Sequence, residues 1–180
     1  YAIMTRRPGD QAGPGAHAAI GIATPLPPVS PNLLAGLLEA VDAEPHRGHA
    51  DLPALAADLQ LEIDDLFPVA EALQLLHLAE VVEGDIRLTE AGKRFVGLDP
   101  DGRKQLFAKQ LRQHVPLGAH IRRVLDERST HRAPQSRFRD ELEDHMTARF
   151  ADDTLRTIIA WGRYAERFTY DEPRGGFRRA

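Results

Sequence analysis

Apolar residues between positions 30 and 76 recur at the three- and four-residue spacing of amphipathic helices. The spacing predicts three helices, over residues 30–44, 51–59 and 64–76, with Ser30 capping the first and Pro31 in its opening turn. The side chains expected on their inner faces are Leu33, Leu34, Leu37, Leu38, Val41, Leu52, Leu55, Ala56, Leu59, Leu66, Val69, Leu73 and Leu76. A small helical core is therefore expected in this part of the chain.

The period then changes from helical to alternating. Residues 79–82 and 86–88 have the pattern of two strands, and Glu83-Gly84-Asp85 between them has the composition of a tight turn. Thr89 is placed to cap a further short helix. Three helices followed by a hairpin are the order of a winged helix.

The second half of the chain repeats this order. The predicted elements are helices over 101–114 and 117–128, a helix from Pro134, a helix capped by Asp152 or Asp153, and strands at 168–170 and from Phe177. Residues 78–82, before the first hairpin, parallel residues 164–168, before the second. We expect a mainly α protein with small β-hairpins (α+β), built as tandem winged-helix-like modules over 32–100 and 101–180.

Residues 8–31 have neither a helical nor a strand period. They are rich in Pro, Gly and Ala, which predicts a linker. The chain starts at Tyr1 with no Met and no signal-peptide pattern, which indicates a piece of a longer polypeptide.

The composition excludes several classes of chemistry for these residues. The 180 residues contain no Cys, which excludes disulfides, thiol catalysis and Cys-ligated metal within them and fits a reducing cytoplasm. No apolar run approaches the roughly 20 residues of a membrane helix. The net charge of −4 conceals an asymmetry. Residues 32–103 carry five basic and fifteen acidic side chains, a net −10, and residues 104–180 carry sixteen and eleven, a net +5.

The charge pattern argues against DNA binding by the first module. Its third helix would have to present basic or amide side chains to a groove, yet residues 62–80 contain five acidic residues and neither Lys nor Arg. The second module mixes arginines with acidic residues, which is typical of an ordinary solvated surface. Nucleic acid is therefore not the expected partner.

No catalytic or metal-binding motif is present. The sequence lacks the GxxxxGK[ST] and GxGxxG phosphate loops, a GxSxG nucleophile elbow and HExxH. Its eight His are scattered and do not form a compact ligand set. We therefore assign no catalytic residue, no metal ligand and no cofactor-binding residue to this chain.

Four segments carry a resemblance to a known family. They are GDIRLTEAGKRFV (84–96), RQHVPLGAHIRRVLDER (112–128), HRAPQSRFRDELEDH (131–145) and WGRYAERFTYD (161–171). They resemble the AAA-associated C-terminal domain fused behind the ATP-binding subunit of ABC importers of the nitrate/sulfonate/bicarbonate type. Residues 1–9, YAIMTRRPG, are similar to the last strand and exit of such an ATPase. The resemblance implies that residues 1–31 are the end of the ATPase domain plus its linker.

The resemblance implies a role beside the ATPase, because the Walker A, signature and Walker B motifs are absent from these residues. ATP and Mg²⁺ would belong to the upstream domain. The implied partners are the ATPase domain and the transporter subunits, with a second copy of the chain as a further candidate. The implied location is cytoplasmic, at the inner membrane only through the permease.

Seven residues are candidates for partner contacts: His114, His120, Arg122, Arg123, Trp161, Arg163 and Tyr164. The opposite charges of the two modules predict that they contact each other in one state, and the ATPase or a second copy in another. Two alternatives remain open at this point, a metal or small-molecule sensor and a winged-helix DNA-binding regulator.

Overall fold

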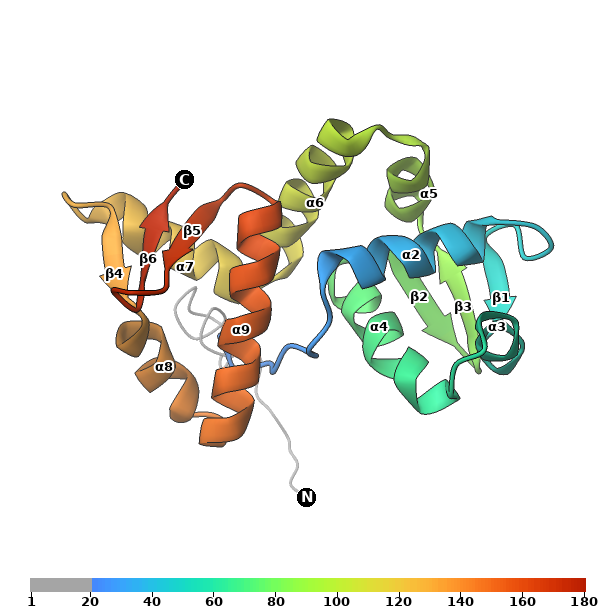
Figure 1. Cartoon of the computed structure of the whole chain (residues 1–180), viewed down its shortest axis with the longest axis horizontal. Coiled ribbons are helices and arrows are strands. Elements are labelled where there is room, and N and C mark those ends of the chain that lie inside the picture. Colours follow the sequence, from blue (N-terminus) through green and yellow to red (C-terminus); the bar gives the residue numbers. More distant parts are fainter. Residues whose placement is uncertain (1–20) are drawn as a thin grey trace, which may run out of the picture.

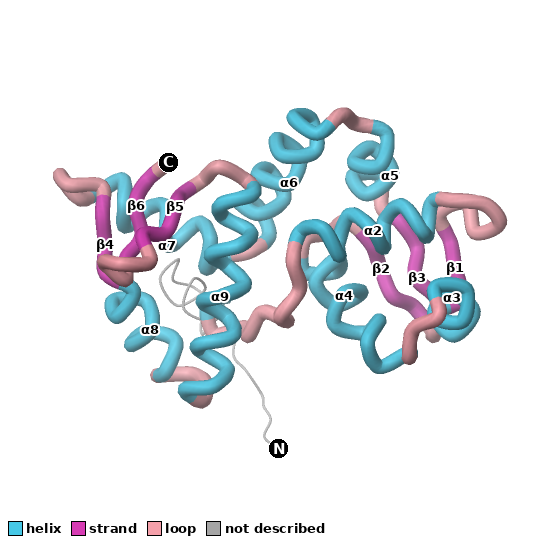
Figure 2. The backbone as a smooth tube through the Cα atoms, in the orientation of Figure 1, coloured by secondary structure: helices cyan, strands magenta, loops and turns pink. Residues whose placement is uncertain are grey.

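The computed structural model describes residues 21–180, which form eight helices and six short strands (Figures 1 and 2). The helices are α2 (Pro31–Asp42), α3 (Leu52–Leu59), α4 (Ile63–Leu75), α5 (Glu90–Gly97), α6 (Pro100–His114), α7 (Pro116–Glu127), α8 (Gln135–Glu143) and α9 (Ala148–Tyr164). The strands are β1 (His49–Asp51), β2 (Ala79–Val82), β3 (Asp85–Leu88), β4 (Arg132–Pro134), β5 (Phe168–Asp171) and β6 (Gly176–Arg179). The expected mainly α class with small β elements is confirmed.

One order of elements occurs twice. Unit 1 (residues 31–88) runs α2, β1, α3, α4, β2, β3, and unit 2 (residues 116–179) runs α7, β4, α8, α9, β5, β6. Each unit has a three-stranded antiparallel sheet, of order β1-β3-β2 or β4-β6-β5. The helices α5 and α6 connect the units across the top of Figure 1. The expected boundary at residue 100 coincides with the start of α6, inside this connection.

Backbone hydrogen bonds align the two units residue by residue. Three bonds of unit 1 have counterparts in unit 2: Leu88 N to Gly48 O with Arg179 N to His131 O, Leu52 N to Gly84 O with Gln135 N to Gly175 O, and Leu78 N to Leu73 O with Arg167 N to Gly162 O. Ala79 is thereby equivalent to Phe168. The sequence parallel between 78–82 and 164–168 is therefore out of register by three residues.

Short strands and one cap differ from expectation. β1 and β4 were not predicted, because three residues are too few to show an alternating period. Both pair with the second strand of the hairpin in their unit. Helix α9 begins earlier than expected: the Thr147 hydroxyl accepts the amide of Phe150, and Asp152 and Asp153 lie inside the helix.

The last part of the expected linker is packed. Ile22, Leu26 and Val29 are buried, and this segment passes α9 on its way to α2 (Figure 1). Leu26 N donates to Thr154 Oγ1 at 3.1 Å, and the Trp161 indole N–H donates to Val29 O at 2.8 Å. The entry to α2 is thus fixed to unit 2. Residues 1–20, with the ATPase-like start, lie outside the described residues.

Helix α6 joins the units firmly. Its Gln110 is buried and donates from Nε2 to Leu76 O, at the end of α4, at 2.9 Å. Arg103 donates to the carbonyls of Phe95, Val96 and Leu98, which end α5. The guanidinium of Arg103 also pairs with Glu39 of α2 at 3.1 Å. Because the buried side chains of both units form one cluster, the relative placement of the units is part of the fold.

Candidate functional site

The predicted contact residue His114 lies at the joint between the units. Its ring stacks on that of His77, with centroids 3.7 Å apart and planes within 6°. Burial, followed by the charge of His77, lowers the pKa of His114 below its usual range. His114 is partly buried against the exposed His77, so its ring contributes to the joint between the units.

His120 and Arg123 contact each other on α7. Arg123 donates to His120 Nδ1 at 3.1 Å, so His120 Nε2 carries the proton and donates to Glu141 at 3.0 Å. The His120 ring also meets the edge of Phe138 at 5.9 Å. This chain of contacts ties α7 to α8, and the guanidinium of Arg123 stays exposed at its end.

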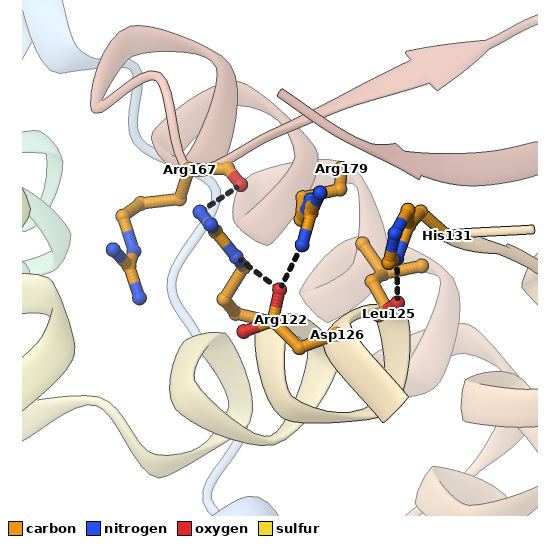
Figure 3. A network of polar contacts seen from close by, with 6 residues as sticks. All are labelled: Arg122, Leu125, Asp126, His131, Arg167 and Arg179. Atoms are coloured by element: carbon orange, nitrogen blue, oxygen red, sulfur yellow. Dashed lines mark hydrogen bonds and ion pairs between the residues drawn. The ribbon is translucent and has the colours of Figure 1, made fainter. Parts of the chain in front are cut away.

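Arg122 is the centre of a second network on α7 (Figure 3). Its Nε donates to Asp126 Oδ1 at 3.0 Å, and its NH1 donates to Arg167 O at 3.0 Å. Arg179 of β6 reaches the same Asp126 oxygen at 3.3 Å. The hydrogen bond from Arg122, and then that from Arg179, lowers the pKa of Asp126. Arg122 therefore holds the sheet of unit 2 onto α7.

The three candidates on α9 separate into core and surface. Trp161 is fully buried with its indole N–H bonded internally, so the structure removes it from the set of contact residues. Tyr164 is half-buried with its ring edge-on to Phe107 at 5.0 Å, and burial raises the pKa of its hydroxyl. Arg163 is exposed and donates to Tyr170 O. Of the seven candidates, Arg123 and Arg163 present exposed charge.

The two oppositely charged halves do not pair with each other. Within residues 21–180, every ion pair joins two residues of 32–103 or two residues of 104–180. The expected contact between the modules is instead made by apolar packing, by hydrogen bonds and by the stacked His77 and His114. In the described part of the chain, no three His, Asp or Glu side chains gather as metal ligands.

An apolar groove on unit 1 was not anticipated. Leu33, Leu59 and Leu61 line it together with buried residues of α2 and α4, and its cavity volume is about 280 Å³. Leu33 and Leu59 were expected to be core residues, but they are 56% and 38% exposed. They lie at the two helix ends that border the groove, where a side chain extends past its own core.

Carboxylates lie next to the groove residue Leu61 in the sequence. Glu62, Asp64 and Asp65 follow Leu61 directly, are exposed, and form no ion pair within residues 21–180. Phe67, on the same turn of α4, is 48% exposed. Three of the six large exposed hydrophobic residues among residues 21–180, Leu33, Leu59 and Leu61, therefore line one groove. A soluble monomer seldom keeps such a cluster open to water.

Comparison with known families gives one match. The model of the C-terminal AAA-associated domain matches residues 53–171, about two thirds of the chain. The chain belongs to this family. The match begins in α3 and ends with β5, so it spans most of both units and the whole connection between them.

Membership in the AAA-associated family makes the chain a domain accessory to an ATPase of that broad class. No curated protein and no solved structure matches the chain. Among residues 21–180, no helix combines the length and apolar character needed to cross a membrane.

Proposed function

We propose that this chain is a non-catalytic regulatory domain of the ATP-binding subunit of an ABC importer of the nitrate/sulfonate/bicarbonate type. It acts by docking on the ATPase domain and changing ATP hydrolysis or subunit assembly. The family match supports an ATPase partner, and the ABC type rests on the sequence resemblance. The duplicated order of helices and strands supports our interpretation of both units as winged helices.

The observation that carries the docking role is the apolar groove, with the exposed carboxylates of Glu62, Asp64 and Asp65 close to Leu61 in the chain. We assign it to a segment of the ATPase that carries apolar residues flanked by Lys or Arg. Leu59 and Leu61 would bury apolar surface, and the three free carboxylates would select and orient a basic partner. The same acidic charge disfavours nucleic acid at α4.

Docking regulates the ATPase if it is tighter in one state of the ATPase than in another. A difference of about 1–3 kcal/mol changes the ratio of the two states about 5- to 150-fold. The firm joint at α6 allows both units to act as one body in this process.

The test replaces Leu59 and Leu61 by Ser in the full-length ATPase subunit. We expect the steady-state ATPase rate to change at least about fivefold. The matched control is the double variant Val82→Ser/Phe150→Ser, because both residues are 53% exposed and lie outside the groove. Equal rates for the two double variants would contradict the proposal.

A further inference from the structure

The outer face of the sheet in unit 2 carries a concentration of arginines. In β4 and β6, Ala133 and Phe177 are cross-strand partners and turn inward to the core. Their neighbours Arg132 and Arg178 are also cross-strand partners, and successive side chains of a strand point to opposite faces. Two arginine side chains therefore leave the sheet next to each other on its outer face.

Further side chains turn this face into a hollow with a volume of about 320 Å³. Arg128 approaches from the end of α7, where it donates to Arg132 O, and Arg174 approaches from the turn between β5 and β6. Gly176 is the next outward position of β6 and has no side chain, which leaves the space open between Pro134 and Asp171.

The charge of the hollow is not compensated by the protein. Like charges directly opposite on neighbouring strands destabilise a sheet, yet Arg132 and Arg178 occupy such positions. Within residues 21–180, neither they nor Arg128 forms an ion pair, and Arg174 meets Asp171 at a long 3.6 Å. Four arginines thus face a single carboxylate.

We propose that this hollow is a binding site for a small soluble phosphate compound, either a phosphate ester or pyrophosphate. A phosphate group presents oxygens in several directions and carries up to two charges, so several guanidinium forks can bind it at once. A carboxylate, with two oxygens in one plane, is satisfied by one arginine. Asp171 is placed to accept a hydrogen bond from a hydroxyl or amino group of the ester. The volume is that of a small-ligand pocket.

Unit 1 supplies an internal comparison. The equivalent outer positions of its sheet are His49, Arg87 and Glu80, and the hollow there holds its own counter-charges. Arg87 pairs with Glu80 at 2.8 Å, and His49 contacts Asp85 at 3.0 Å. The position of Glu80 is taken in unit 2 by Thr169, and that of Asp85 by Gly176. The charges that neutralise this face in unit 1 are therefore missing in unit 2.

The test titrates the chain with pyrophosphate and with AMP by calorimetry at low salt. We expect saturable binding of at least one of these compounds, and the double variant Arg132→Gln/Arg178→Gln to weaken it at least about tenfold. The matched control is Arg149→Gln/Arg156→Gln, which removes the same charge from exposed positions of α9. We expect the control to bind like the unchanged chain.

Thermal unfolding of both variants shows whether they are folded. The Arg132→Gln/Arg178→Gln variant should be at least as stable as the unchanged chain, because it removes a like-charge pair.

Three outcomes would overturn the proposal. They are the absence of binding at millimolar ligand, an equal loss in both double variants, and binding to phosphatidylglycerol vesicles or duplex DNA but to neither soluble phosphate. The last outcome would assign the hollow to a membrane surface or to nucleic acid. None of these readouts depends on the ATPase, so the docking role stands or falls separately.

Discussion

The two units have the same order of helices and strands, but at one helix–strand contact the large and the small residue are exchanged between them. In unit 1 the helix contributes the large residue, Leu73, and the strand the small one, Ala79. At the equivalent positions of unit 2 the helix carries Gly162 and the strand Phe168. A Cβ atom on Gly162 would lie 2.2 Å from the Phe168 ring. A duplicated fold therefore conserves the volume at a contact and not the residues that fill it.

The largest expected effects come from breaking this exchange. Phe168→Ala should lower the free energy of unfolding by about 3–5 kcal/mol, because it empties a fully buried site. Gly162→Leu should cost about 3 kcal/mol or more, because its side chain overlaps the ring. The double variant reproduces the packing of unit 1, so its loss should fall short of the sum by about 0.5–3 kcal/mol. Urea unfolding of the three variants measures this, and strict additivity would contradict it.

This exchange explains why the sequence predicts the duplication only in outline. Helical and alternating periods predicted the eight helices and both hairpins, but they placed the N-cap of α9 at Asp152 or Asp153 in place of Thr147. The parallel between residues 78–82 and 164–168 rested on similar residue types. In the structure, Ala79 is equivalent to Phe168, which is a dissimilar residue. The three-residue strands β1 and β4 owe their conformation to pairing with distant strands, which no local period encodes.

The candidate sites were harder to predict, because they depend on what lies across from each residue. Trp161 is a residue type that often binds partners, and it was a candidate for that reason. In the fold it is buried against a segment whose sequence resembles a linker. Arg122 was a candidate for partner contacts, but in the fold it is engaged by Asp126 and by the backbone carbonyl of Arg167. Arg132 and Arg178 are 46 positions apart, and only the register of β4 and β6 brings them together. Charge counting found the basic half of the chain but not this pair.

The two units also hold α6 differently, at equivalent positions. Each unit has a residue of positive φ directly after its third helix, His77 in unit 1 and Glu166 in unit 2. His77 stacks on His114, at one end of α6, and Glu166 pairs with Lys104, at the other. The first contact is between the ring of the exposed His77 and that of the partly buried His114, and the second is between two exposed charges. We expect the first to matter more.

The stacked contact predicts a dependence of stability on pH. The folded pKa of His114 is lowered, so around pH 6 the unfolded chain binds a proton more readily than the folded chain. Its contribution is complete above the unfolded pKa of about 6.5 and is lost as the pH falls toward the folded value. His114→Gln should remove this component, which urea unfolding between pH 5 and pH 8 detects as a flatter profile. Identical profiles for the two proteins would show that the stack is not the cause.

A smaller effect sharpens the comparison of the two sheets. Thr169→Glu places in unit 2 the carboxylate that Glu80 supplies in unit 1, directly across from Arg178. It should raise the free energy of unfolding by about 0.2–1 kcal/mol, and Glu80→Thr should lower it by a similar amount. Thermal unfolding measures both changes. Thr169→Gln is the control for side-chain size, and an equal gain from Gln would exclude charge as the cause. Thr169→Glu should also weaken any binding of pyrophosphate.

The smallest effect is expected at the exposed end of α6. Lys104 and Glu166 are 40% and 71% exposed, and their charged atoms are 3.6 Å apart. At such exposure the attraction is screened by water and salt and is offset by the entropy lost in holding two long side chains. Lys104→Gln should change the free energy of unfolding by about 0.2 kcal/mol or less, and Glu166→Gln by a similar amount. A double-mutant cycle measured at low and high salt isolates the pair. A coupling energy above about 1 kcal/mol would contradict this expectation. It would mean that the ion pair contributes as much to the contact between unit 2 and α6 as the stacked rings contribute to the contact between unit 1 and α6.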